Sequence, residues 1–117
     1  MHIEIQRIYE NHEHKEGIRI LVDRLWPRGI SKVEARLDHW WKELAPSTEL
    51  RKSFHHNVDN WPDFKIKYFA QLDTQKPLIS EKLKDLDLNQ PLILLYGAKD
   101  KDHNQAVLLK EYLEGDY

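Results

Sequence analysis

Two short segments of this chain carry the side chains that are able to do chemistry. In the first, Asp23, Arg24, Trp26 and Arg28 follow directly after an apolar run. Guanidinium groups bind phosphate and carboxylate groups through paired hydrogen bonds. Two arginines, a carboxylate and an indole around a proline-glycine turn therefore indicate either the rim of an anion-binding site or a structural corner.

The second segment, residues 96–104, follows another apolar run and contains a phenol, an imidazole and an amide. Ligands of open α/β sheets usually bind outside the carboxyl ends of the strands. If the two runs are neighbouring parallel strands, both segments meet at one edge. We predict a pocket there with a proton shuttle (His103), a carboxylate that orients an arginine (Asp23), and ligand-binding residues Arg24, Trp26, Arg28, Tyr96 and Asn104.

The elements that would position these side chains follow from the hydrophobic pattern. Short apolar segments at residues 3–8, 18–22 and 91–98 predict strands, with the helices between the second and third strands. A strand that returns to its sheet through helices favours parallel pairing. We expect an α/β fold with a small, mainly parallel sheet of about three strands and about five helices, in a single domain spanning residues 1–117.

The expected helices have recognisable starts and stops. A first helix is predicted over residues 31–44, where Ser31 and Glu34 form a capping box and Trp41 lies half exposed beside the apolar stripe. Later helices are expected to begin at polar caps or prolines and, for the last one, to end at a glycine: Ser47 or Thr48, Asn60 or Trp61, Pro77, Asp102 and Gly115. Asn104 is open to two roles, ligand binding or capping.

Composition excludes several classes of function. The chain has 117 residues, a formal net charge of -2 and no cysteine, which argues against a broadly basic nucleic-acid surface and rules out thiolate chemistry. No apolar run approaches a membrane span or a signal peptide, and we expect a cytoplasmic protein without membrane contact.

No cofactor and no metal site are predicted. Adjacent histidines such as His55 and His56 point about 100° apart on a helix, and His12 and His14 fall in a polar loop expected over residues 11–17. Motifs of the P-loop, dinucleotide-binding and nucleophile-elbow types are missing.

Three functions remain open on the residues alone. The first is a small protein that binds an anion in a pocket, either as a binding protein or as an enzyme acting on a small phosphorylated or carboxylated molecule. The second is a nucleotide- or nucleic-acid-binding module in which Trp26 and Trp41 stack on bases. The third is a protein-interaction module in which the arginine and tryptophan corner is purely structural. The oligomeric state is not predicted.

Three blocks of the sequence resemble a known family. They read V-D-R-L-W-P-R-G-I-S-K, then L-A-P-S-T-E-L-R-K-S-F-H-H, then L-L-Y-G-A-K-D-K-D-H-N-Q-A-V-L-L-K-E-Y-L. The chain is similar over nearly its whole length to the domain-of-unknown-function family 488, in its short YeaO-like branch. The resemblance implies a compact α/β protein of bacteria or archaea with no established activity. Longer relatives carry cysteines after the last strand, and their chemistry does not transfer to this cysteine-free chain.

Overall fold

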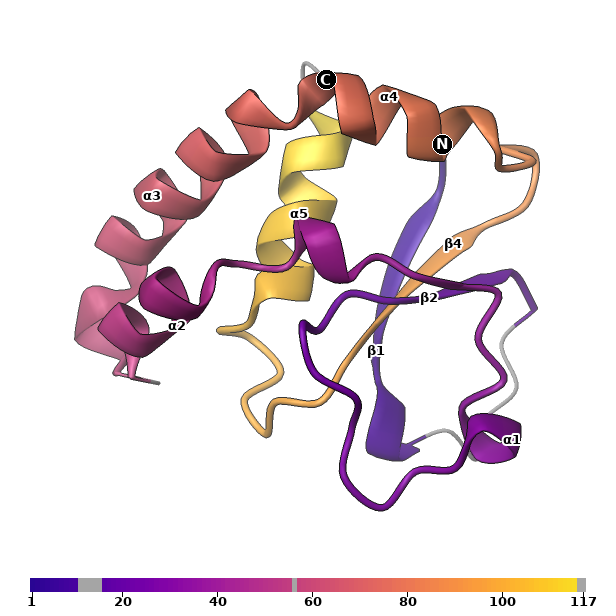
Figure 1. Ribbon diagram of the computed structural model, residues 1–117, viewed down its shortest axis with the longest axis horizontal. Helices are drawn as coiled ribbons and strands as arrows, with labels where there is room; N and C mark the ends of the chain where they lie inside the picture. Colours follow the sequence, from indigo (N-terminus) through magenta and orange to yellow (C-terminus); the bar gives the residue numbers. More distant parts are fainter. Residues whose placement is uncertain (11–15, 56, 116–117) are drawn as a thin grey trace.

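The computed structural model describes residues 1–10, 16–55 and 57–115 (Figure 1). Within these ranges a four-stranded sheet has the order β1-β4-β2-β3, and every neighbouring pair is parallel. The α/β class and the parallel sheet predicted from the sequence are confirmed, with one more strand than expected. The strands are β1 (Ile3–Arg7), β2 (Ile18–Leu21), β3 (His39–Trp40) and β4 (Leu92–Tyr96).

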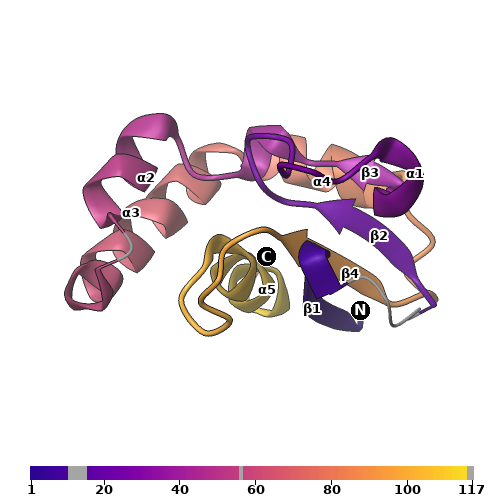
Figure 2. The ribbon, with the colours of Figure 1, turned by 90° about the horizontal axis from the view of Figure 1, so that it is seen from below.

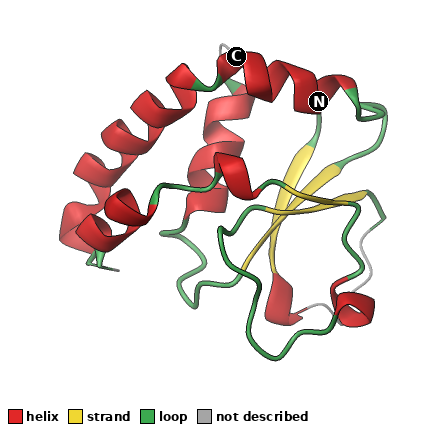
Figure 3. Ribbon diagram, in the orientation of Figure 1, coloured by secondary structure: helices red, strands yellow, loops and turns green. Residues whose placement is uncertain are grey.

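Five α-helices occur in the described ranges, as the sequence indicated (Figure 3). In Figure 1, α3 and α4 form an arc around α5, and α1 lies at the opposite corner of the molecule. The helices are α1 (Lys32–Ala35), α2 (Thr48–Phe54), α3 (Trp61–Thr74), α4 (Lys76–Lys84) and α5 (Gln105–Glu114). Short 3-10 helices cover Ile8–Glu10, Lys42–Leu44 and Val58–Asn60.

The central strand β4 is buried on both faces because each face meets a different core. Leu92 and Leu94 belong to the larger core, which also contains residues of α2, α3, α4 and α5. Ile93 and Leu95 belong to a smaller core closed by Ala35 of α1 and by the segment that follows β2. The sheet therefore lies between a thick helical layer and a thin layer of loop and short helix (Figure 2).

The predicted helix over residues 31–44 is wrong beyond its first turn. The capping box of Ser31 and Glu34 is present, but Arg36 adopts a left-handed conformation with φ of 47° and ends α1. The carboxylate of Asp38 then accepts a hydrogen bond from the backbone N–H of Arg19 at 2.8 Å, and the chain continues as β3. Pairing with β2 buries Trp41 to 3% exposure, so the expected half-exposed position is also wrong.

The helix starts agree with the sequence except in the last helix. The Ser47 side chain caps α2, and prolines occupy the first turns of α3 and α4. The predicted cap Asp102 is wrong, because the side-chain oxygen of Asn104 accepts the N–H groups of Ala106 and Val107 at 3.0 and 3.2 Å. Of the two roles left open for Asn104, capping is therefore present.

Part of the predicted loop over residues 11–17 lies outside the described residues, together with His12, His14 and His56. In the described ranges, no helix is long and apolar enough to cross a membrane.

Candidate functional site

The ends of β2 and β4 meet as the sequence predicted. These strands are parallel neighbours, with Leu21 opposite Leu95. Asp23 lies two residues after Leu21, and Gly97 lies two residues after Leu95. The N–H of Gly97 donates a hydrogen bond of 2.9 Å to Oδ2 of Asp23. A parallel register carries both chains out of the sheet at the same edge. The prediction that the carboxyl ends of these two strands lie at the same edge of the sheet is confirmed.

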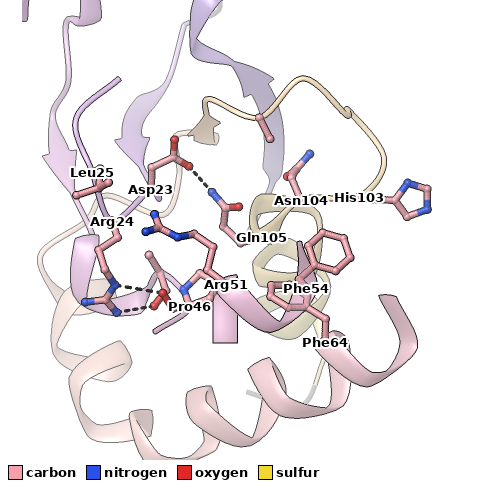
Figure 4. A pocket seen from close by; sticks show the side chains of 12 residues that line it. Asp23, Arg24, Leu25, Pro46, Arg51, Phe54, Phe64, His103, Asn104 and Gln105 are labelled. Atoms are coloured by element: carbon pink, nitrogen blue, oxygen red, sulfur yellow. Dashed lines mark hydrogen bonds between the residues drawn. The ribbon is translucent and has the colours of Figure 1, made fainter. Parts of the chain in front are cut away.

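A cavity of about 230 Å³ opens at this edge, between the strand ends, α2 and α5 (Figure 4). Half of the residues around it carry polar or charged side chains: Asp23, Arg24, Arg51, His103, Asn104 and Gln105. The other half are apolar: Leu25, Ala45, Pro46, Phe54, Phe64 and Ala98. The cavity thus has both polar groups able to orient a ligand and apolar surface able to bury one.

Asp23 is held at the polar end of the cavity by its neighbours. Besides the Gly97 N–H, it accepts a short hydrogen bond from Nε2 of Gln105. Burial raises the pKa of Asp23 to about 6, which outweighs the lowering effects of these two hydrogen bonds and of the Arg51 charge. The carboxyl group therefore titrates much closer to neutral pH than an ordinary aspartate.

Arg24 is occupied by the backbone of the loop before α2. Its Nε donates to the carbonyl of Pro46 at 3.1 Å and its Nη2 to the carbonyl of Ala45 at 3.0 Å. This fork fixes the loop that leads into α2, and with it the wall of the cavity. Arg24 lines the cavity but has a structural task there.

Arg51 was not among the predicted site residues. It lies on α2, three residues before the buried Phe54, and in Figure 4 its guanidinium points toward Asp23 and Gln105. In the described part of the chain its guanidinium makes no hydrogen bond or ion pair. Residues three apart lie on the same face of a helix. An inward-facing Phe54 therefore indicates that Arg51 lies on the face of α2 that borders the cavity, and this was the signal in the sequence.

Gln105 was also missed, although it directly follows the predicted Asn104. As the first residue of α5 it projects toward the end of β2 and reaches Asp23 across 82 positions of sequence. Its role depends on where α5 begins, which the sequence placed two residues too early.

His103 lines the cavity, but its ring is engaged elsewhere. Nδ1 lies 3.0 Å from Oδ2 of Asp100, and the edge of the ring packs against Trp61 with centroids 5.1 Å apart. Figure 4 shows the imidazole pointing away from Asp23. The two residues predicted as catalytic thus lie at one cavity without facing each other.

Trp26, Arg28 and Tyr96 do not line the cavity. Trp26 donates from Nε1 to the carbonyl of Ile30 at 2.7 Å and packs edge-on against Trp40, in the thin layer on the other face of the sheet. The Arg28 side chain is exposed.

Tyr96 is 2% exposed in the larger core, where burial is the main cause of the rise in its pKa.

Among the described residues, no three histidine, aspartate or glutamate side chains gather to hold a metal ion.

The fold and the cavity define a small α/β protein with a partly polar pocket at the carboxyl ends of a parallel sheet. The family model described as the inactive DUF488-N3 subclade matches residues 2–117, so this chain belongs to that domain-of-unknown-function family. The resemblance found in the sequence is confirmed.

Relatives of similar length are known in bacteria. An uncharacterised Escherichia coli protein, YeaO, is 47% identical over 113 residues, which cover 97% of each chain. An uncharacterised protein of Mycobacterium tuberculosis is 31% identical, over 97% of this chain and 94% of its own. No solved structure matches the chain.

Proposed function

We propose that this protein binds a small molecule through a carboxylate or phosphate group in the cavity between β2, β4, α2 and α5, and that it does not transform the molecule. The description of the matched subclade as inactive favours binding over turnover. The engagement of His103 with Asp100 rather than with Asp23 is in line with this.

The observation that carries the proposal is that the Arg51 guanidinium has no bonding partner among the described residues. Its guanidinium lies at a cavity whose other wall is apolar, and it makes no ion pair with any described residue. The other cavity arginine, Arg24, is already bonded to two carbonyls. A planar fork of N–H donors beside an apolar wall suits a carboxylate or a phosphate.

The nucleic-acid alternative has less support. Its stacking platform required Trp26 and Trp41, but Trp41 is buried and Trp26 packs against Trp40. A net charge of -2 also disfavours a long polyanion. The third alternative, a protein-interaction module, agrees with the bonds of Arg24 and Trp26 but gives no role to the cavity or to Arg51.

The test is a thermal-shift screen with acetate, 3-phenylpropionate, inorganic phosphate, glucose 6-phosphate and adenosine monophosphate. The chain offers matched variants, Arg51→Ala in the cavity and Arg28→Ala on the exposed turn. A ligand at 100 times its dissociation constant stabilises the folded state by about 2.7 kcal/mol. We expect a rise in Tm for wild type and Arg28→Ala that is lost in Arg51→Ala.

Two outcomes would contradict this proposal. If no anion in the panel raises Tm, or if Arg28→Ala loses the effect as fully as Arg51→Ala, the cavity is not an anion site. If a panel molecule is consumed by wild type and not by His103→Ala, the enzyme alternative with His103 and Asp23 replaces the binding function. The cytoplasmic location stays a prediction.

A further inference from the structure

The polar end of the cavity offers two opposite kinds of recognition side by side. Arg51 presents N–H donors and a positive charge. Asp23 is an acceptor whose two oxygens already take hydrogen bonds from Gly97 and Gln105. A carboxylate has about four lone-pair sites, so Asp23 keeps capacity for a further donor. The side-chain oxygen of Gln105, whose Nε2 donates to Asp23, is a further acceptor at this cavity.

The remaining wall sets the size and the character of the ligand. Phe54 and Phe64 pack with ring centroids 4.7 Å apart, and both lie at the cavity. The volume of about 230 Å³ is below the roughly 300–1,000 Å³ of pockets for drug-sized molecules. The space therefore suits one ring or one branched aliphatic group rather than a base, a ribose and a phosphate together.

The N-terminus of α5 is not the place for the anion. The side chain of Asn104 already accepts the N–H groups of Ala106 and Val107. The helix end is thereby satisfied from within the chain. Arg51 remains as the available anion-binding group at this cavity, and the negative end of a ligand must be close to it.

We propose that the ligand is a zwitterion, an α-amino acid with an aromatic or large apolar side chain. Arg51 binds its carboxylate, Asp23 and the Gln105 oxygen accept its ammonium N–H groups, and Phe54 and Phe64 pack against its side chain. An ionised Asp23 weakens the binding of a simple anion at Arg51 without preventing it, and an ammonium group on the ligand turns this repulsion into attraction. This inference rests on the proposed function, because it assigns the anion to Arg51.

The experiment is a calorimetric titration at pH 7.5 with three related compounds. Phenylalanine carries both charges, 3-phenylpropionate lacks the ammonium group, and phenethylamine lacks the carboxylate. We expect phenylalanine to bind wild type at least about tenfold more tightly than either analogue, since a hydrogen bond to a charged group is lost in each case.

Protein variants then assign each charge of the ligand to a residue. Asp23→Asn should weaken the binding of phenylalanine about tenfold. It should leave the binding of 3-phenylpropionate unchanged or make it tighter, because only phenylalanine has an ammonium group that needs the Asp23 carboxylate. Arg51→Gln should weaken both compounds. Asp102→Asn, which removes the same charge from an exposed position, should change neither.

The outcomes separate this inference from the proposed function. If 3-phenylpropionate binds as tightly as phenylalanine and both depend on Arg51, the zwitterion is wrong and the anion site stands. If no compound here or in the anion panel binds in a manner that depends on Arg51, both proposals fail. If Asp23→Asn weakens the two acids equally, Asp23 shapes the cavity and does not read the ammonium group.

Discussion

Two arginines border the same cavity, and their surroundings differ. Arg24 extends from the segment after β2, and its guanidinium donates hydrogen bonds to the carbonyls of Ala45 and Pro46. Arg51 enters from α2, is exposed, and pairs with no described residue. Arg24, inside the conspicuous motif, is bonded to the backbone, whereas the Arg51 guanidinium makes no hydrogen bond with any described residue. The residue types in a motif therefore do not show which side chains already have hydrogen-bond partners in the fold.

The same contrast divides the motif itself. Asp23 and Arg24 turn toward the cavity, whereas Trp26 turns to the opposite face of the sheet and joins the smaller core. The indole of Trp40 ties the halves together by donating to the carbonyl of Asp23 at 2.7 Å. The corner and the site are one segment with two tasks.

The largest expected effect concerns the structural arginine. Arg24→Ala should lower the free energy of unfolding by about 3 kcal/mol, because two hydrogen bonds from a charged group to partly buried carbonyls are lost. Arg51→Ala should stay within about 0.5 kcal/mol of wild type, as is usual for an exposed side chain without partners. Urea unfolding monitored by tryptophan fluorescence measures both values.

Equal losses in the two variants would contradict the division of labour between these arginines. In that case Arg51 contributes to the fold as much as Arg24 does. Arg28→Ala is the control, since its backbone carbonyl, not its side chain, accepts the Tyr9 hydroxyl at 2.9 Å. It should be close to neutral.

The second prediction concerns the pH dependence of stability at Asp23. Its pKa in the folded protein is about 6, above the value of an unfolded aspartate, so the folded state holds the proton more tightly. The stabilisation by protonation is full below about pH 4 and is lost as pH rises through 6. Asp23→Asn removes this dependence and should be about 2 kcal/mol more stable than wild type at pH 7.

The difference between Asp23→Asn and wild type should vanish near pH 4, which urea unfolding at the two pH values tests. The comparison of variants matters because Glu43 and Asp100 have lowered pKa values and act in the opposite direction in both proteins. Asparagine keeps an oxygen for the Gly97 N–H and can donate to the oxygen of Gln105. A variant that is less stable than wild type at pH 7 would mean that the carboxylate is held favourably as an ion.

The smallest effect tests where the last helix begins. Asn104→Ala should lower the free energy of unfolding by about 1 kcal/mol, the usual cost of a lost N-cap. Asp102→Ala should be nearly neutral, because its side chain caps nothing in the described structure. Differential scanning calorimetry of the two variants is sufficient. A larger loss in Asp102→Ala would move the start of α5 back to the position expected from the sequence.

Local signals predicted the elements that depend on local physics. The apolar runs around Ile20 and Leu94 became neighbouring parallel strands, and Ser31 and Ser47 cap helices as expected. The helix through residues 31–44 failed because Leu37 and Trp40 have helical spacing but are used in pairing and packing against β2. Helical periodicity does not reveal that a neighbouring strand has an open edge.

The sequence by itself determined the α/β class, the parallel order of β2 and β4, and the edge of the sheet at which Asp23 and Asn104 both lie. These follow from hydrophobic period, caps and the rule for parallel strand ends. Only the tertiary structure decided which charged groups are occupied. Whether a guanidinium lies within reach of a carbonyl depends on the path of a loop far away in the chain. That path gives Arg24 two carbonyl partners and leaves the Arg51 guanidinium without a hydrogen bond to any described residue.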